Sequence, residues 1–575
     1  MSKTPNYDAK IKTILDALEP GERVCELTGE KWDMTEEEIS WYRKFNVPPS
    51  KKAPQTRMVI VAAFGNSFQW WYQKHPETGK QILTYAHPAS GVRVLPDKEW
   101  FDQDFSKITQ PFDKQKPTFE IVRKLELAIP FTASRNMKEP ENSLCVVSLG
   151  DVNDTLMMAC QARNSLFSIV LTNGESSAEV LFGDSVSNSY NISHGDRIHQ
   201  CNFLRDSHDC INCSFLFDCR NCEDCFGAVN RRNAKYIFWE EQLSESEYRA
   251  RMKEIDLSCR KSLDGYKLHF QKMVAEAIWP ENFNVKAEGC VGEYLVNTTD
   301  CKYAYCCSHG PKNNYWTNFT FGQSEGNAFL DGGSGAINSY YSLGLSDSNL
   351  CEFCFGVSNC MNLEYCMQCY NCENCFGCVG LQRKKFCIFN KQYNEDEYWA
   401  KVDELKCAML ERGEYGEFFP LSFSSAYLPE STSVWLGVNT EEQARKLGAN
   451  VFPITAEGAV GNIDSTERRT LEEIPDCVDG LSDEWIGKPI FDPEINRRFA
   501  FFPQEIQFYR KINLAPPARH FISRVKDLIA EANIAQYEET NCGQCNTSLT
   551  VAKNTTYKDR NIYCHECYLR YLETR

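Results

Sequence analysis

The centre of the chain repeats a pattern of hydrophobic, polar and glycine positions with a 12-residue period. One column of this period holds aromatic side chains: Phe329, Tyr341, Phe353 and Tyr365. Further columns at the same spacing hold apolar residues, glycines or cysteines: Leu343, Phe355, Met367 and Val379; Gly332, Gly344 and Gly356, then Gln368 and Gly380; Cys354, Cys366 and Cys378; Cys360 and Cys372; and Cys351, Leu363, Cys375 and Cys387. This alignment of several kinds of side chain at one spacing indicates stacked, equivalent positions.

A β-solenoid explains this period. Each 12-residue coil would contribute short strands, the coils would stack about 4.8 Å apart, and glycine would form the tight corners. An α-helix does not fit, because glycines recur inside the pattern and the columns would drift around a turn of about 3.6 residues. The alternative is an irregular, cysteine-rich loop region.

The repeated block occurs twice, with a 150-residue offset. Residues of the first copy recur in the second at this offset: Cys219, Cys222, Cys225, Phe226, Gly227, Lys235, Glu247 and Tyr248 correspond to Cys369, Cys372, Cys375, Phe376, Gly377, Lys385, Glu397 and Tyr398. Upstream of Cys201 the period is hard to follow. Each copy ends in a predicted helix, 244–257 and 394–410, which begins with a capping residue and early acidic residues. These helices would cover the open end of each solenoid.

A second duplication relates the two ends of the chain at a constant 467-residue offset. The matching positions are Glu38, Ile39, Tyr42, Arg43, Lys44, Asn46 and Pro49 with Glu505, Ile506, Tyr509, Arg510, Lys511, Asn513 and Pro516. The same offset places His75, Thr78, Asp97 and Trp100 opposite Cys542, Cys545, Cys564 and Cys567. The N-terminal copy has therefore lost the four cysteines. A further knuckle-like turn begins at Cys25, with Thr28 and Gly29, but a single thiol cannot hold a metal ion.

The C-terminal copy keeps a metal-binding pattern. Two CxxC pairs, Cys542 with Cys545 and Cys564 with Cys567, are separated by the segment 546–563. This spacing is typical of zinc-ribbon or treble-clef modules, in which each pair forms a knuckle around a tetrahedral Zn²⁺. Zinc is favoured over iron because four-thiolate knuckles of this spacing are usually closed structural sites. We expect one structural zinc ion here, and His565 to lie outside the ligand set.

These patterns predict a mainly β, multidomain protein. Duplicated 12-residue β-solenoid-like repeats would be flanked by zinc-ribbon-like or treble-clef-like modules with short capping helices. The predicted segments are an N-terminal tail at 1–20, a degenerate zinc-ribbon-like module at 21–110, the first cysteine-rich solenoid copy with its helix at 130–275, the second at 285–412, a connecting region with a short helix from Glu441 to Leu447 at 413–494, and the zinc-binding module at 495–575.

Composition bears on the compartment. The segment 1–20 lacks the apolar stretch of a signal peptide. The longest apolar run, 58–64, is far shorter than the roughly 20 residues that a membrane helix needs. We therefore expect a soluble, cytoplasmic protein in a reducing compartment, whose 29 cysteines are metal ligands or buried thiols.

Charge suggests where a partner binds. The net charge of −17 argues against nucleic acid coating the whole chain. Residues 495–575, however, carry 12 Lys and Arg against 8 Asp and Glu. Five basic residues there are candidates for an anion-binding surface: Arg510, Lys511, Arg519, Arg524 and Lys526. A solvated helix face is the alternative meaning of these charges.

Two other classes of function remain open. The first is an iron–sulfur or thiol redox protein, because several central cysteines have a spacing similar to that of ferredoxins: Cys219, Cys222, Cys225, Cys366, Cys369, Cys372, Cys375 and Cys378. These residues would form a second metal or thiol cluster. Against a cluster, leucine and serine replace cysteine elsewhere in these columns, as buried packing positions allow. The second class is a transferase, for which no nucleophile can be identified. No common phosphate-binding, metalloprotease, hydrolase or dinucleotide motif is found, so no catalytic residue is assigned.

The chain resembles a family of cysteine-rich zinc-module proteins from uncultured candidate-phyla bacteria. The resemblance rests on the stretch 503–517, on the two CxxC pairs followed by Tyr568, on the Cys-Phe-Gly repeats, and on the segments 415–420 and 440–451. It implies a cytoplasmic zinc protein of unestablished function. Some members carry a CoA-transferase label, which we regard as a misassignment. Where relatives have paired cysteines, this chain has Thr28, His75, Thr78, Asp97 and Trp100. We therefore expect a zinc-binding, non-catalytic interaction or scaffold protein, whose C-terminal module contacts nucleic acid, a ribonucleoprotein or another protein.

Overall fold

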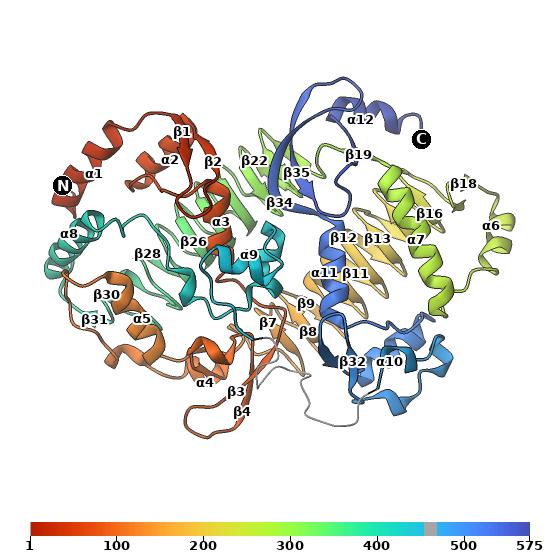
Figure 1. Ribbon diagram of the computed structural model, residues 1–575, viewed down its shortest axis with the longest axis horizontal. Coiled ribbons are helices and arrows are strands. Elements are labelled where there is room, and N and C mark those ends of the chain that lie inside the picture. Colours follow the sequence, from red (N-terminus) through yellow and green to blue (C-terminus); the bar gives the residue numbers. More distant parts are fainter. Residues whose placement is uncertain (1, 454–468) are drawn as a thin grey trace. The chain divides into compact units, whose positions relative to one another are not determined.

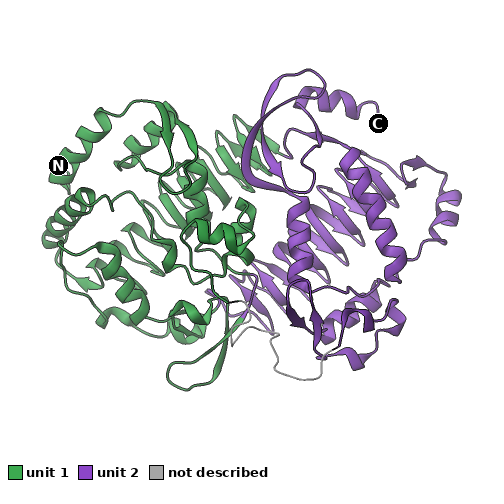
Figure 2. Cartoon of the chain, in the orientation of Figure 1, with its two compact units in different colours: residues 1–67, 71–133, 284–453 green, residues 68–70, 134–283, 454–575 purple. Residues whose placement is uncertain are grey.

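A computed structural model describes residues 2–453 and 469–575 of the chain. The chain divides into two compact units (Figure 2), each of which combines one end of the sequence with one central block. Unit 1 contains residues 1–67, 71–133 and 284–453, and unit 2 contains residues 68–70, 134–283 and 454–575. The finer division predicted from the sequence stays a prediction, and residues 454–468 of its connecting region lie outside the described residues.

The protein is mainly β and contains several separate sheets (Figure 1). The largest sheet lies in unit 2 and has 12 strands. Its neighbouring strands pair in parallel, except β17 and β18, which are antiparallel. Its strands are β7 (Leu144–Val146), β8 (Thr155–Met158), β9 (Gln161–Arg163), β10 (Ile169–Glu175), β11 (Ala178–Ser187), β12 (Tyr190–His199), β13 (Asn202–Arg205), β14 (Cys210–Ile211), β15 (Ser214–Phe217), β16 (Phe226–Val229), β17 (Ile237–Phe238) and β18 (Glu241–Gln242).

Unit 1 contains a second stack of parallel strands, divided into sheets of two, six and four strands. Its strands are β20 (Val285–Glu288), β21 (Val291–Glu293), β22 (Val296–Thr299), β23 (Lys302–Tyr305), β24 (Tyr315–Phe321), β25 (Ala328–Ser334), β26 (Tyr340–Ser346), β27 (Phe355–Ser358), β28 (Met361–Glu364), β29 (Glu373–Phe376), β30 (Lys385–Ile388) and the antiparallel β31 (Lys391–Gln392). We call the two stacks the parallel ladders.

Neighbouring strands of both ladders pair at the spacing of the sequence columns. Leu343 pairs with Phe355 and Ala178 with Tyr190, and both pairs match the 12-residue period. The step is less regular at the start of each ladder. Leu144 pairs with Thr155, one position short of the period, and Lys302 pairs with Tyr315, one position beyond it. In the unit 2 ladder the step changes only upstream of Ile169, which pairs with Leu181 at 12 residues and with Met158 at 11. The regular period therefore begins earlier in the chain than Cys201, where the sequence columns become hard to follow.

Glycine does not form the corners of the ladders alone. The aromatic column itself has left-handed backbone conformations, with φ values of 56° at Phe329, 43° at Tyr341, 55° at Phe353 and 53° at Tyr365. Gln368, which stands in the glycine column, has a φ of 47°. The expectation that glycine supplies the corners is therefore incomplete. Residues with a β-carbon incur a steric cost in this region, and here they do so at buried positions of the ladders.

Twelve α-helices are found in the described residues. They are α1 (Pro5–Asp16), α2 (Glu36–Phe45), α3 (Pro54–Ala62), α4 (Asp97–Phe101), α5 (Thr118–Ala128), α6 (Glu245–Met252), α7 (Arg260–Glu276), α8 (Glu395–Glu411), α9 (Glu441–Lys446), α10 (Pro503–Lys511), α11 (Phe521–Glu531) and α12 (His565–Leu572). Helices α6 and α8 follow the two ladders as predicted, and their caps, Ser244 and Asn394, accept backbone N–H groups of the first turn. Helix α6 ends at Met252, earlier than expected, and the long α7 was not foreseen.

The two ends of the chain contain equivalent modules, one in each unit. Four antiparallel hairpins form them: β1 (Gly21–Val24) with β2 (Lys31–Met34), β3 (Trp71–Lys74) with β4 (Gln81–Thr84), β32 (Ile490–Asp492) with β33 (Arg497–Phe499), and β34 (Asn533–Asn541) with β35 (Ser548–Asn554). Two short parallel pairs join them to their surroundings: β5 (Val94–Leu95) with β6 (Phe131–Thr132), and β19 (Ile278–Pro280) with β36 (Asn561–Tyr563). The order hairpin, two helices, hairpin, helix is the same at both ends, as the 467-residue offset implies.

A disulfide joins Cys259 and Cys477 within unit 2, across 218 residues of sequence. The two cysteines form an isolated antiparallel bridge, flanked by hydrogen bonds from Arg260 N–H to the Asp476 carbonyl and from Val478 N–H to the Ser258 carbonyl. The expectation that every cysteine is a metal ligand or a buried thiol is therefore wrong for this pair. Sequence reasoning missed it because neither cysteine belongs to a repeat column. Within the described ranges, none of the helices has the length and apolar character needed to cross a membrane.

Candidate metal centre

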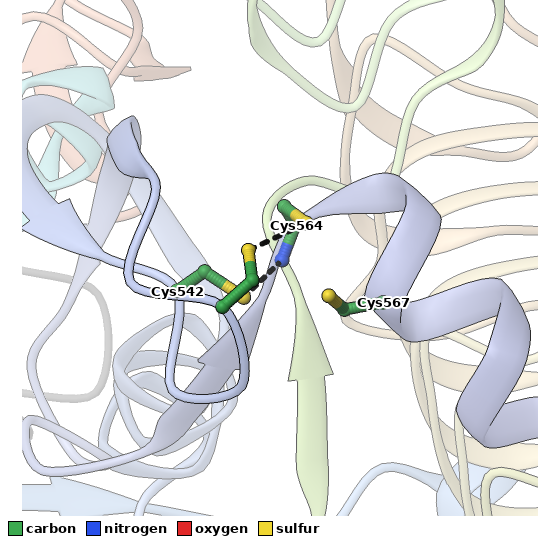
Figure 3. Close-up of side chains that lie close together, drawn as sticks. Cys542, Cys564 and Cys567 are labelled. Atoms are coloured by element: carbon green, nitrogen blue, oxygen red, sulfur yellow. Dashed lines mark hydrogen bonds between the residues drawn. The ribbon is translucent and has the colours of Figure 1, made fainter.

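The four cysteines of the C-terminal module converge at one point of unit 2. Their sulfur atoms all lie within 4.8 Å of one another. Cys542 directly follows β34, and Cys545 lies in the turn before β35. Cys564 caps the N-terminus of α12, and Cys567 lies in its first turn. Figure 3 shows Cys542 of the hairpin turn beside Cys564 and Cys567 at the start of this helix.

Backbone hydrogen bonds hold the hairpin turn that carries the first pair. The Cys542 N–H donates to the Thr547 carbonyl at 2.8 Å, and the Asn546 N–H donates to the Cys542 carbonyl at 2.9 Å. Asn546 has a φ of 61°, a conformation that asparagine tolerates better than most residues. The Cys564 N–H donates to the Cys542 sulfur at 3.2 Å, which joins the two knuckles directly. These backbone hydrogen bonds fix the turn that carries Cys542 and Cys545 and connect it to Cys564.

The geometry fits a tetrahedral metal ion. A regular tetrahedron with Zn–S bonds of about 2.3 Å has sulfur–sulfur edges of about 3.8 Å. The sulfur atoms of Cys545 and Cys564 lie 3.7 Å apart. Four sulfur donors and no carboxylate or imidazole make up the group. The four cysteines can thus hold a metal ion, and the donor set is the one that closed structural sites use.

Local hydrogen bonds favour the thiolate form at two of these cysteines. Burial raises the pKa of Cys542, but N–H donors of Cys564, Cys545 and Gln544 outweigh it and lower the pKa to about 6. The Thr547 hydroxyl lowers the pKa of Cys545. Metal ions bind the thiolate, so these donors reduce the cost of deprotonation at neutral pH.

The N-terminal counterpart keeps the turn but has lost the ligands. The His75 N–H donates to the Lys80 carbonyl at 2.7 Å, and the Gly79 N–H donates to the His75 carbonyl at 3.0 Å, at the positions equivalent to those of the Cys542 turn. The His75 Nε2 atom lies 2.9 Å from a Glu99 carboxylate oxygen. Trp100, opposite Cys567 in the alignment, is fully buried and donates from Nε1 to the Pro130 carbonyl at 2.7 Å. In the N-terminal module, the His75–Glu99 contact and the Trp100 indole are therefore found where the C-terminal module has cysteines.

The central cysteines line the interior of the ladders. Eight of them were candidates for a second cluster: Cys219, Cys222, Cys225, Cys366, Cys369, Cys372, Cys375 and Cys378. All are buried in apolar clusters. Each thiol is hydrogen-bonded to the carbonyl two residues earlier and to the carbonyl nine residues later; Cys219, for example, contacts those of Phe217 and Ala228, both at 3.5 Å. Among the described residues, ligand atoms gather within 4.8 Å only in the C-terminal group and in Cys259, Asp476 and Cys477.

The five basic residues proposed as an anion-binding surface are not all exposed. Arg524 is only 8% exposed, and its guanidinium contacts Glu179, Glu505 and the Tyr509 hydroxyl. It therefore does not belong to a surface, because its charge is neutralised inside unit 2. Arg510 donates to the Leu481 carbonyl and to Asp483, Lys511 to Asn188, and Arg519 to Asp527 and Glu494. Lys526 also has an interaction partner.

The structure shows contacts of the metal module that the sequence did not indicate. Tyr568, the residue after Cys567, donates its hydroxyl to Asp218, a fully buried carboxylate of the unit 2 ladder. The Asn230 amide lies 2.9 Å from the same hydroxyl. Arg232 forms an ion pair with Asp218 at 2.9 Å. Tyr568 therefore attaches α12 to the ladder at the position next to Cys567. Only its place beside a CxxC pair hints at this role.

Comparisons with known proteins identify no family. No family model and no curated protein matches the chain. A solved structure of a Desulfovibrio desulfuricans protein assigned as an acetyltransferase aligns with 54% of this chain and 95% of its own, at 7% sequence identity and a TM-score of 0.11.

Proposed function

We propose that the protein is a zinc-binding interaction or scaffold protein. Cys542, Cys545, Cys564 and Cys567 would hold one structural Zn²⁺, which joins the β34–β35 hairpin to α12. The supporting observation is the convergence of four sulfur atoms within 4.8 Å. A small module gains much of its folding energy from such an ion, so zinc would determine whether the C-terminal module is folded and able to bind.

The scaffold part of the proposal concerns the two ladders. We interpret each as a β-solenoid built from 12-residue coils, with a zinc-ribbon-like module packed beside it, intact in unit 2 and degenerate in unit 1. The parallel register of Ala178 with Tyr190 and of Leu343 with Phe355 supports this interpretation. Stacked coils present extended surfaces that suit binding better than catalysis. This interpretation agrees with the resemblance to cysteine-rich zinc-module proteins of candidate-phyla bacteria.

Metal analysis of the purified protein tests the zinc centre. We expect about one zinc ion per chain and no visible absorption, and loss of the zinc when Cys542 and Cys564 are replaced by serine. The matched control is Cys407→Ser, because Cys407 is a half-buried cysteine of α8 outside the group. Iron with acid-labile sulfide, retained in the Cys542→Ser/Cys564→Ser variant, would instead support the redox alternative with central cysteines as ligands.

The partner of the scaffold is proposed to be a macromolecule, either a nucleic acid or a protein, bound at the C-terminal module. Arg510 and Lys511 are partly exposed, and we propose that they contact this partner. Binding of a fluorescent single-stranded RNA is measured at increasing salt, since phosphate contacts weaken as salt rises. Arg510→Glu/Lys511→Glu is expected to abolish salt-dependent binding, with Arg43→Glu/Lys44→Glu at the equivalent N-terminal positions as the control. Equal binding by both variants contradicts the proposed surface.

A further inference from the structure

Cys290 lies at the first rung of the unit 1 ladder. It stands between β20 and β21, and among the described strands these pair only with β22 and β23. Glu288 pairs with Thr299 and Val291 with Lys302, so the register places Cys290 directly against Cys301 of the next rung. The column continues through Asn314, because the Lys302–Tyr315 pair adjoins it. Cys301 is fully buried, whereas Cys290 is partly exposed because it ends the column.

Donors surround the Cys290 sulfur. The Cys301 N–H donates to it at 3.4 Å, and the Thr298 hydroxyl lies 3.4 Å away. Similar N–H donation recurs inside the column, for example from Cys351 N–H to the Ser339 hydroxyl at 3.2 Å. Deeper rungs are closed on both sides, however. At the first rung, the equivalent N–H group donates to the Cys290 sulfur, which has one face open to solvent.

We propose that Cys290 is a reactive thiol that forms a reversible disulfide with Cys301. The Cys290 thiolate attacks one sulfur of a low-molecular-weight disulfide, whose S–S bond breaks and releases one thiolate. The neighbouring Cys301 sulfur then attacks the Cys290 sulfur of the mixed disulfide, and the Cys301 proton passes to the second leaving sulfur, which departs as a thiol. One external disulfide is reduced to two thiols, and the two protein thiols are oxidised.

The stacking of the two rungs suits this bond. Adjacent parallel strands lie about 4.8 Å apart, inside the range of about 4.4–6.8 Å between α-carbons that disulfides span. The electrostatics favour Cys290 as the thiol that attacks first, because the hydrogen bond to Cys290 and burial raise the pKa of Cys301. The pKa of Cys290 is lowered to about 6, chiefly by a hydrogen bond from the Cys301 thiol. Burial acts in the opposite direction, whereas the Thr298 hydroxyl, the Cys301 N–H and the Lys302 charge lower the pKa further. By contrast, burial raises the pKa of Cys407, the other half-buried free cysteine outside the metal group.

Limited alkylation of the intact protein at neutral pH tests the reactivity. The protein is treated briefly with iodoacetamide, digested with trypsin, and each cysteine peptide is quantified by mass spectrometry. We expect Cys290 to react about fivefold to tenfold faster than Cys407, because the gain in thiolate outweighs its lower intrinsic nucleophilicity. Equal rates at the two sites would overturn the proposal. Peptide mapping reports each site separately, so the state of the metal centre does not affect the comparison.

Treatment with glutathione disulfide tests the second step. Trypsin leaves Cys290 and Cys301 in one peptide, residues 287–302, so the internal disulfide appears as a loss of two hydrogen atoms. We expect this product in the unaltered protein, and a stable glutathione adduct on Cys290 in the Cys301→Ser variant. The proposal fails if the unaltered protein accumulates the same adduct, or if neither product forms.

Discussion

The guanidinium carbon of Arg57 lies 3.3 Å from the centroid of the Phe329 ring. Arg57 is fully buried on α3. It donates to the hydroxyl groups of Tyr42 and Tyr340 and lies 3.9 Å from the Glu38 carboxylate. The equivalent residue of unit 2 is Arg524 on α11, which contacts the Tyr509 hydroxyl at 2.8 Å. There Glu179 stands at the position of Phe329 and forms an ion pair with the arginine. The two units thus attach a helix to a ladder by the same arginine with different partners.

This difference predicts unequal costs for the two arginines. Arg524→Met leaves Glu179 and Glu505 buried without their cation, so we expect a loss of about 3–5 kcal/mol of stability. The Arg57–Glu38 ion pair is longer, at 3.9 Å, and Arg57→Met retains an apolar contact with Phe329. We therefore expect a smaller loss of about 1–3 kcal/mol, the cost of leaving buried polar groups with one partner fewer. Unfolding by denaturant, monitored by hydrogen exchange of peptides from each unit, measures the loss of stability in both variants. Adding Glu179→Phe to Arg524→Met should recover part of the loss, and equal costs for the two single variants would contradict this account.

The contact between Tyr568 and Asp218 predicts that docking of α12 and metal binding depend on each other. Tyr568→Phe removes the hydroxyl and leaves a buried carboxylate with one donor fewer, at a cost of about 1–3 kcal/mol. We expect faster hydrogen exchange in 561–572 and weaker competition with a zinc chelator, because undocking and metal loss then favour each other. Tyr571→Phe on the same helix is the control, since its hydroxyl lies at a longer 3.4 Å from Asn230. Unchanged zinc retention in Tyr568→Phe argues against the coupling.

Asp331 predicts a pH-dependent stability of unit 1. Burial, only partly offset by an Asn318 hydrogen bond, raises the pKa of this carboxyl from 3.8 to about 7. The folded state therefore holds the proton more tightly than the unfolded state. The resulting stabilisation is fully present below about pH 4 and is lost as the pH rises through 7. Asp331→Asn keeps the group neutral, so its advantage over the natural protein should grow by about 2–3 kcal/mol between pH 5 and pH 8.

Thermal unfolding at several pH values measures this effect. The exposed Asp33→Asn provides the control, with no expected growth in stability over the same range. The counterpart of Asp331 in the unit 2 ladder is Leu181, at the 150-residue offset, so an apolar residue is accepted at this position. A constant difference between Asp331→Asn and the natural protein at all pH values would show that the carboxyl ionises normally.

The cysteine columns predict mild effects for conservative changes. Cys351 lies between Ser339 and Leu363 in one column, so a hydroxyl and an aliphatic side chain are both tolerated there. The Cys351 thiol is hydrogen-bonded to the Asn349 carbonyl, and a serine hydroxyl can make the same bond. We therefore expect Cys351→Ser to cost about 1 kcal/mol and to leave the metal content unchanged. Cys351→Asp should unfold unit 1, because it buries an unpaired charge. Loss of bound metal from Cys351→Ser would show that the central thiols are ligands rather than packing groups.

Features that depend on local spacing could be predicted from the order of the residues. The 12-residue columns predicted which residues pair, since parallel strands align equivalent positions of successive repeats. The two CxxC pairs predicted the metal group, because each pair needs only a short turn to bring its sulfur atoms together. The 467-residue offset predicted equivalent modules at the two ends. Local chemistry acts over a few residues, and the sequence displays it directly.

The other features depend on contacts between distant segments, which arise when the chain folds. The disulfide between Cys259 and Cys477, the burial of Arg524 among acidic residues, and the docking of Tyr568 on Asp218 each join segments that lie far apart in the sequence. Charge and spacing suggested that Arg524 faces solvent, but a buried carboxylate of the ladder made the interior favourable. The reactive position of Cys290 likewise depends on where the stack ends. Such properties arise from the neighbours that folding supplies, and a linear pattern does not contain them.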